Sequence, residues 1–169
     1  KELMKPVDDE LNVVFAKSEV DLNGTKGDDK GAIGNRNGET NLGDLITDAM
    51  LWKAMNDINF NVDRRNVVAI TNGGGIRASI SKGDVTKKDI NTVLPFGNTL
   101  SVVYVTGDKL LEALEASTYC SPTPVGGFPQ VAGMTFAISA DVKYDANKDT
   151  YPGSTYYGPN TIKRVDILE

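Results

Sequence analysis

The sequence predicts a single α+β domain with a mixed β-sheet and two main helices. Its 169 residues are 40% hydrophobic and 24% charged, which is typical of one globular domain. Two stretches with helical periodicity, 42–58 and 107–117, predict the main helices. Runs of β-branched residues around them predict the strands. No apolar run approaches the roughly 20 residues that span a bilayer, so we expect no membrane span.

The charge balance and the absence of histidine exclude several classes of function. Eighteen Lys and Arg residues against 23 Asp and Glu residues give a net charge of −5, so we expect no nucleic-acid polymer as a partner. The sequence contains no His, which excludes imidazole-dependent triads and histidine metal centres from this chain. The single Cys120 cannot form an internal disulfide.

The first part of the chain predicts a lead-in, a long loop and a helix. Residues 1–12 predict a short helical lead-in that Pro6 breaks, and the domain itself is expected over 13–169. Extended structure is expected at 13–16 and 20–22. Residues 23–41 hold five Gly and four Asn without apolar periodicity, which predicts a loop. Asn41 is the expected N-cap of the first main helix, with Asp44 at its third position and an apolar stripe from Leu42 to Met50.

The middle of the chain predicts two strands and two helices. A buried strand over 67–71 ends abruptly at three glycines. Thr86 and Asp89 have the spacing of a capping box for a short helix that Pro95 ends. Residues 100–105 predict a strand, and Thr106 is expected to cap the helix over 107–117.

The last part of the chain predicts a meander or hairpin. Short alternating stretches at 134–138, 142–144 and 162–168 predict its strands. Tyr151, Tyr156 and Tyr157 are interpreted as strand or turn aromatics. Because the chain begins and ends within charged, apolar-patterned sequence, we expect it to be part of a longer protein.

The run Asn72-Gly-Gly-Gly-Ile-Arg77 contains groups that suit a phosphorylated ligand. Glycines let a ligand approach the backbone, whose N–H groups can bind an anion. Asn72 offers a donor and an acceptor to a base edge, and Arg77 offers a planar fork to phosphate or carboxylate. A tight turn followed by an exposed arginine is the alternative interpretation.

Two further side chains are candidates for the same site. Phe96 lies between Pro95 and Gly97, where its ring could serve as a stacking platform for a purine; packing in the core is the alternative. Arg36 precedes the first main helix in the glycine-rich loop, where it either meets an anion or is a solvated loop charge.

Four motifs together carry a family resemblance. They are Arg36-x-x-Glu39-x-Asn41-Leu-Gly-Asp-Leu, Asn72-Gly-Gly-Gly-Ile-Arg77, Gly83-Asp-Val-Thr and Val93-Leu-Pro-Phe-Gly97. In order and spacing they resemble the C-terminal domain of the 5′-nucleotidases, a group that includes periplasmic UDP-sugar hydrolases and 2′,3′-cyclic-nucleotide phosphodiesterases. The similarity extends from about residue 13 to residue 168.

The resemblance implies a nucleoside-recognition domain without catalytic residues of its own. It implies that Arg36 and Arg77 contact the charged or ribose side of a nucleotide, that Asn72 bonds to the base, and that Phe96 stacks on it. Gly74 belongs to the same expected substrate-binding set. Hydrolysis, with two divalent metal ions, would belong to an N-terminal metallophosphatase domain of the same polypeptide. The implied location is extracytoplasmic: periplasmic, secreted or at the cell surface.

One part of the family pattern is not found. The family places a second stacking aromatic and a ribose-binding Asp in a Gly-Gly-Asp segment near its C-terminus, and this sequence has no such segment. The alternative function is therefore a non-catalytic binding or dimerisation module whose nucleotide pocket is vestigial.

Overall fold

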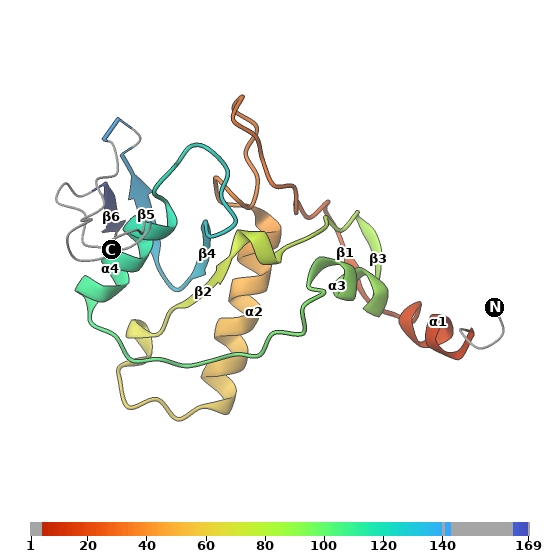
Figure 1. Cartoon of the computed structure of the whole chain (residues 1–169). Helices are drawn as coiled ribbons and strands as arrows, with labels where there is room; N and C mark the ends of the chain where they lie inside the picture. The colour runs from red at the N-terminus through yellow and green to blue at the C-terminus, as the bar shows by residue number, and fades with distance from the viewer. Residues whose placement is uncertain (1–4, 140, 143–163, 169) are drawn as a thin grey trace.

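The computed structural model describes residues 5–139, 141–142 and 164–168, and these form an elongated body with the two ends of the chain at opposite ends (Figure 1). The described helices are α1 (Lys5–Leu11), α2 (Asn41–Asp57), α3 (Lys87–Val93) and α4 (Gly107–Ser117), with 3₁₀ turns at Arg64–Asn66 and Gly73–Gly75. The described strands are β1 (Val14–Ser18), β2 (Ala69–Asn72), β3 (Gly83–Thr86), β4 (Pro129–Ala132), β5 (Thr135–Ile138) and β6 (Val165–Leu168).

The strands pair in twos. Three antiparallel ladders join β1 to β3, β2 to β4 and β5 to β6. The predicted α+β class and both main helices are confirmed. The expected mixed sheet differs in detail, because the described strands are only four or five residues long and none of them has a second neighbour.

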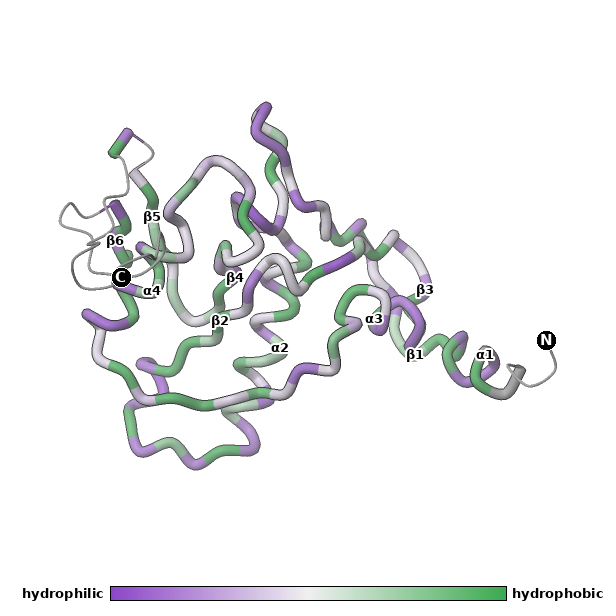
Figure 2. Tube along the Cα trace, in the orientation of Figure 1, coloured by the Kyte–Doolittle hydropathy of each residue, from purple (hydrophilic) through white to green (hydrophobic). Residues whose placement is uncertain are grey.

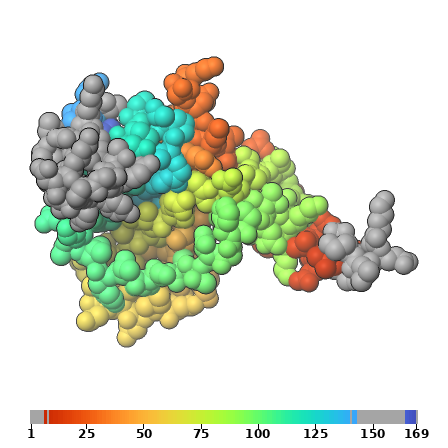
Figure 3. Space-filling model, in the orientation of Figure 1, coloured from red at the N-terminus to blue at the C-terminus, as the bar shows by residue number. Residues whose placement is uncertain are grey.

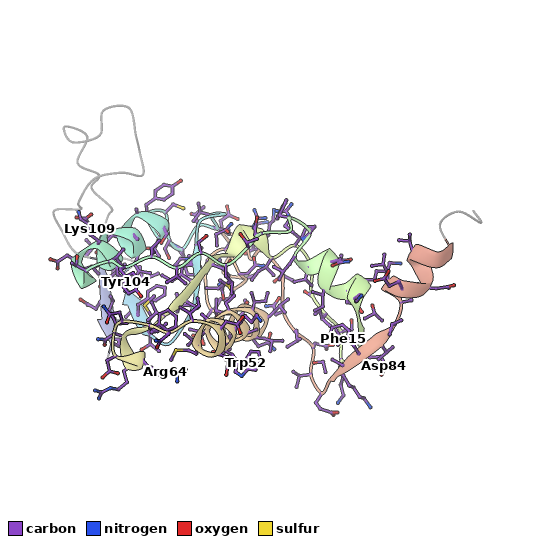
Figure 4. All side chains as sticks on the ribbon, turned by 90° about the horizontal axis from the view of Figure 1, so that it is seen from below. Phe15, Trp52, Arg64, Asp84, Tyr104 and Lys109 are labelled. Atoms are coloured by element: carbon purple, nitrogen blue, oxygen red, sulfur yellow. The ribbon has the colours of Figure 1, made fainter. Side chains whose placement is uncertain are left out.

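The two ends of the body have different elements. Helix α2 packs on β2 and β4, and α4 packs on β6. At the other end, α1 and α3 accompany the β1–β3 ladder. Figure 4 shows Phe15 and Asp84 on this ladder, well apart from Trp52 on α2. None of the described helices is both long enough and apolar enough to cross a membrane.

A cluster of buried apolar side chains joins the two ends. Its members come from five parts of the chain. They are Leu22 before the long loop, Leu42 at the start of α2, Ile76 and Ile80 after the glycine turn (Gly73–Gly75), Val85 on β3 and Val93 on α3. The predicted stripe on α2 is only partly buried. Leu42 is 1% exposed, whereas Leu45 is 50% exposed.

Helix α2 begins one residue earlier than predicted. Thr40 is its N-cap, and the Thr40 side chain accepts a hydrogen bond from the Gly43 N–H. Asn41 bonds instead to the chain before the loop: its Oδ1 accepts from the Asn23 N–H at 2.8 Å and its Nδ2 donates to the Asp21 carbonyl at 2.9 Å. The side chain predicted to cap the helix therefore closes the base of the loop.

The predicted strand over 100–105 is wrong for the described structure. These residues are an extended link between α3 and α4 without a strand partner among the described residues. Figure 2 shows the link as mostly hydrophobic, and Figure 3 shows it crossing the surface of the body. Val103 is 75% exposed. β-branched residues favour an extended backbone, but they do not supply the neighbouring strand that a sheet requires.

The ends of the chain hold further differences. Pro6 does not break the lead-in helix, because it lies in the first turn of α1, where its missing N–H has no helical acceptor. Strands β5 and β6 fall where alternation predicted strands. Val142 and Arg164, within the predicted stretches 142–144 and 162–168, are described and lie outside any strand. Residues 143–144 and 162–163, and Tyr151, Tyr156 and Tyr157, lie outside the described residues.

The predicted capping box at α3 is confirmed and gives a pH-dependent prediction. Asp89 Oδ2 accepts from the Thr86 hydroxyl at 2.6 Å and from the Thr86 N–H at 2.8 Å, and these bonds lower the pKa of Asp89. A lowered pKa in the folded state means that the ionised carboxylate stabilises the fold above the unfolded pKa of about 3.9, and that this stabilisation is lost as the pH falls through the lowered pKa. We expect Asp89→Asn to reduce stability at pH 7 and to reduce the acid sensitivity of unfolding. Thr86→Ala should cost about 1 kcal/mol at pH 7.

Urea unfolding between pH 2.5 and pH 7 measures both effects. Asp84→Asn is the matched control, because Asp84 lies on β3, just before the capping box, and forms no side-chain hydrogen bond recorded among the described residues. Equal acid sensitivity in wild type and Asp89→Asn would contradict the prediction.

Candidate functional site

A cationic cavity of about 370 Å³ lies between the long loop and the segment after the glycine turn. Three basic side chains line it, Lys26, Arg36 and Arg77, and no carboxylate does. Of the remaining lining residues, Ile76 is a large apolar residue and the others are small or polar: Gly24, Thr25, Ala78 and Ser79. Such a lining suits an anion, because each basic group can donate a charge-assisted hydrogen bond.

Arg36 enters this cavity from the loop with one donor unsatisfied. Its backbone carbonyl accepts from the Val125 N–H at 2.8 Å, which fixes the main chain. Its Nε is buried and has no hydrogen-bond partner among the described residues. An unpaired buried donor costs free energy, so packing elsewhere must offset this position of the Arg36 side chain, and a ligand in the cavity would meet the other N–H groups of the guanidinium. Of the two interpretations of Arg36, the geometry favours the anion contact.

The glycine turn is shaped by close packing. It follows β2 as a 3₁₀ turn, and none of its three glycines has a positive φ. A Cβ at Gly73 would overlap the carbonyl oxygen of Asn35, and one at Gly74 would lie 2.7 Å from the carbonyl oxygen of Gly126. The Gly73 and Gly74 N–H groups donate to Phe128 and Gly126. The prediction that backbone N–H groups of this turn bind an anion is therefore wrong for Gly73 and Gly74, because both donors are already paired within the protein.

Asn72 lies at the end of β2, beside the cavity and outside its lining. Its Nδ2 donates to the Gly126 carbonyl at 3.3 Å. This bond orients the side chain, which is exposed. The amide oxygen forms none of the hydrogen bonds found among the described residues, so an acceptor remains for a ligand.

Arg77 and Phe96 are in contact, as the shared-site prediction requires. The Arg77 Cζ lies 5.9 Å from the centroid of the Phe96 ring, within the range of a cation–π interaction. Phe96 is 61% exposed, which disfavours the core alternative. Gly97 follows it with φ 61°, a conformation in which glycine has no steric cost. The structure thus brings Arg36, Arg77 and Phe96 to one region, with Asn72 and Gly74 at its edge.

Sequence reasoning missed three polar residues of the cavity. Thr25 and Lys26 lie in the glycine-rich loop, and Ser79 lies two residues after Arg77. The Ser79 hydroxyl accepts from the Gly24 N–H at 2.9 Å, which holds the loop against the opposite wall. The composition of residues 23–41 predicted the loop, but no local pattern distinguished Lys26 from the other charges there.

A second cavity, of about 300 Å³, has the opposite electrostatic character. Strands β4 and β5 supply an apolar wall, and Glu39 and Asp44 line the other side. Burial raises the pKa of Asp44, and the nearby carboxylates of Glu39 and Asp48 raise it further. An anionic ligand is therefore favoured in the first cavity and disfavoured in the second.

Gln130 on β4 holds the loop that separates the two cavities. It is 2% exposed. Its Nε2 donates to the carbonyls of Gly38 at 2.8 Å and Asn35 at 3.2 Å, and its Oε1 accepts from the Thr40 N–H at 3.3 Å. A single side chain thus pairs three backbone groups on either side of Arg36, which restricts the position of that guanidinium.

The residues of this chain do not fit the two-metal centre that the resemblance places elsewhere. The sequence has no His. Among the described residues, no three Asp, Glu or Cys side chains gather so as to hold a metal ion. The described part of the chain therefore provides no ligand set for such a centre.

Comparisons with known proteins identify relatives of this chain by sequence. The family model for the 5′-nucleotidase C-terminal domain matches residues 14–163. A trifunctional nucleotide phosphoesterase protein of Bacillus subtilis, YfkN, is 45% identical over 108 residues, which cover 64% of this chain and 7% of that protein. A 5′-nucleotidase of Vibrio parahaemolyticus is 36% identical over 132 residues, which cover 78% of this chain and 20% of that protein.

A solved structure gives the same result in three dimensions. The 5′-nucleotidase precursor of Thermus thermophilus superposes with a TM-score of 0.72 and 33% identity, over 98% of this chain and 31% of that one. This chain therefore spans less than a third of the length of each of these relatives.

The role of Gln130 gives a stability prediction. Gln130→Met keeps the size of the side chain and leaves the Asn35 and Gly38 carbonyls and the Thr40 N–H without their partner. Because each unpaired buried group costs about 1–3 kcal/mol, we expect a loss of at least about 2 kcal/mol in the free energy of unfolding. Urea unfolding measures it.

Asn56→Leu is the matched control for Gln130→Met. The Asn56 side chain also donates to a backbone carbonyl, that of Trp52, but it is exposed, so its loss should change stability by less than about 0.5 kcal/mol. Similar effects of the two substitutions would show that Gln130 does not hold the loop.

Proposed function

The chain belongs to the 5′-nucleotidase C-terminal domain family, and from that premise we propose that it is the nucleoside-recognition domain of a nucleotide-hydrolysing phosphoesterase. The observation that carries the proposal is the position of Arg77, which lines the cationic cavity and also lies over the Phe96 ring. An anion site beside an exposed aromatic ring matches the two chemically different ends of a nucleotide.

In this proposal each predicted residue has a role. Arg36 and Arg77 donate to the phosphate or to ribose oxygens, and Lys26 adds positive charge to the same cavity. Phe96 stacks on the base, and the Asn72 amide bonds to the base edge. Gly74 supports the site through its backbone: its carbonyl accepts from Arg77 Nη1 at 3.1 Å.

We propose that hydrolysis is performed by another part of the polypeptide, in a metallophosphatase domain with two divalent metal ions. The absence of His and the lack of a metal-binding group among the described residues support this division. The Vibrio 5′-nucleotidase is long enough for a further domain, since this chain covers only 20% of it. An extracytoplasmic location is proposed from the family alone.

Titration of this chain with AMP, followed by NMR chemical shifts, tests the recognition role. A small ligand loses several kcal/mol of translational and rotational freedom on binding, and screened contacts with exposed charges contribute little. We therefore expect a Kd no tighter than about 1 mM, near −4 kcal/mol. Phe96→Ala should cost about 1–3 kcal/mol of binding, Arg36→Ala should weaken AMP roughly two- to fivefold, and added salt should weaken it further.

Lys53→Ala is the control, because it removes a cation from the exposed Lys53–Asp57 pair on α2, away from the cavity lining. Two outcomes would favour the alternative of a binding or dimerisation module. One is chemical-shift changes confined to the second cavity, and the other is an AMP affinity that neither Arg36→Ala nor Phe96→Ala changes. Phosphate release from AMP by this chain with added divalent metal would overturn the proposed division of labour.

A further inference from the structure

Arg77 contacts both halves of the candidate site. Its guanidinium lies over the Phe96 ring, with 5.9 Å between Cζ and the ring centroid, and the same side chain lines the cavity that contains Arg36 and Lys26. Of the described residues, only Arg77 has both properties. The two halves are therefore not independent.

A guanidinium can serve two partners because its face and its edge are different surfaces. The face stacks on an aromatic ring, and the edge carries five N–H donors in a fixed plane. In Arg77, one Nη1–H is bonded to the Gly74 carbonyl at 3.1 Å. The other donors have no hydrogen-bond partner recorded among the described residues, so the edge remains available to an anion in the cavity.

A backbone hydrogen bond fixes the segment that carries Arg77, whereas the ring of Phe96 is less restrained. The Arg77 N–H donates to the Val93 carbonyl at 2.9 Å, which fastens the segment after the glycine turn to the last residue of α3. Phe96 follows three residues later and is 61% exposed, so few neighbouring atoms fix its ring. The guanidinium supplies a contact that restricts the ring orientation.

We propose that Arg77 is a positioning residue that couples base stacking to anion binding: its face holds one side of the Phe96 ring so that a base stacks on the other side, while its edge holds the phosphate. The inference rests on the proposed function. If Arg77 only bound phosphate, an uncharged nucleoside would bind without it. In the proposed role, binding of an uncharged nucleoside also depends on Arg77. Lysine keeps the charge but lacks the planar face, so Arg77→Lys should uncouple the two halves.

The stacking contact is tested first without a ligand. Protons held over an aromatic ring shift to lower frequency in the NMR spectrum through the ring current. We expect the side-chain δ and ε proton signals of Arg77 to move toward ordinary arginine values in Phe96→Leu, whereas those of Arg64, on an exposed 3₁₀ turn, stay unchanged. Arg77 signals that are the same in wild type and Phe96→Leu would overturn the inference whatever the protein binds.

The coupling is tested by titrating adenosine and AMP into wild type, Arg77→Lys and the control Arg64→Lys. Arg77→Lys keeps a cation but removes the planar contact with the ring, which contributes no more than a cation–π contact of about 0.5–1 kcal/mol, so we expect it to weaken adenosine up to about fivefold and AMP by at least as much. Arg64→Lys should change neither. Adenosine binding that is unaffected by Arg77→Lys would overturn the inference and leave the proposed function standing. A wild-type chain whose signals do not move with either ligand at concentrations far above about 1 mM would overturn both.

Discussion

The close contact between the glycine turn and the long loop is the constraint on which the rest of the site depends. The absence of a side chain at Gly73 lets the carbonyl of Asn35 approach to a position that a Cβ would occupy. Asn35 is fully buried, and its Nδ2 donates to the carbonyls of Gly24 and Ile76. Gln130 bonds to the same stretch from β4. Because these bonds are buried, they cannot be exchanged for bonds to water without cost, and the irregular loop is held as firmly as a strand.

This fixed loop also separates opposite charges. Arg36 faces the cationic cavity, while Glu39, three residues later, lines the cavity that contains Asp44. Gln130 bonds to the carbonyls of Asn35 and Gly38, and these bonds hold the stretch between the two charges in place. The fold instead leaves the Arg36 Nε buried and unpaired and the pKa of Asp44 raised, two unfavourable conditions that packing elsewhere must offset. The proposed recognition of an anion would benefit from that separation, since a paired arginine would have to release its partner first.

The sequence predicts features that depend on neighbours along the chain and misses those that depend on distant ones. The bonds between Thr86 and Asp89 span three residues, and their spacing alone predicts them. The sequence places the cap of α2 at Asn41 instead of Thr40, because the partners of Asn41 lie 18 and 20 residues away. The sequence suggests that position 73 is glycine because the backbone there needs conformational freedom. In the structure, glycine is required because the carbonyl of Asn35, 38 positions earlier in the chain, occupies the place of a Cβ. No local sequence pattern predicts strand β4 or the role of Gln130. The β-branched run at 100–105 has a strong strand pattern, but no partner strand among the described residues pairs with it. The candidate site residues come from the family motifs, and no pattern within a window of a few residues would join Arg36 to Arg77.

The arrangement of the site bears on selectivity more than on affinity. In the proposed function, an exposed ring and three basic groups would also accept purines without phosphate, or phosphate without a base, and each contact alone would be weak in water. A ligand gains from both only if its anionic and aromatic ends are linked at the separation that the protein provides, because the second contact then costs no further loss of translational freedom. Arg77 is shared between the two contacts, and its main chain is fixed to Val93 at the end of α3. Backbone hydrogen bonds therefore fix the segment that carries Arg77, and the Arg77 and Phe96 side chains set the final separation between the two proposed contacts.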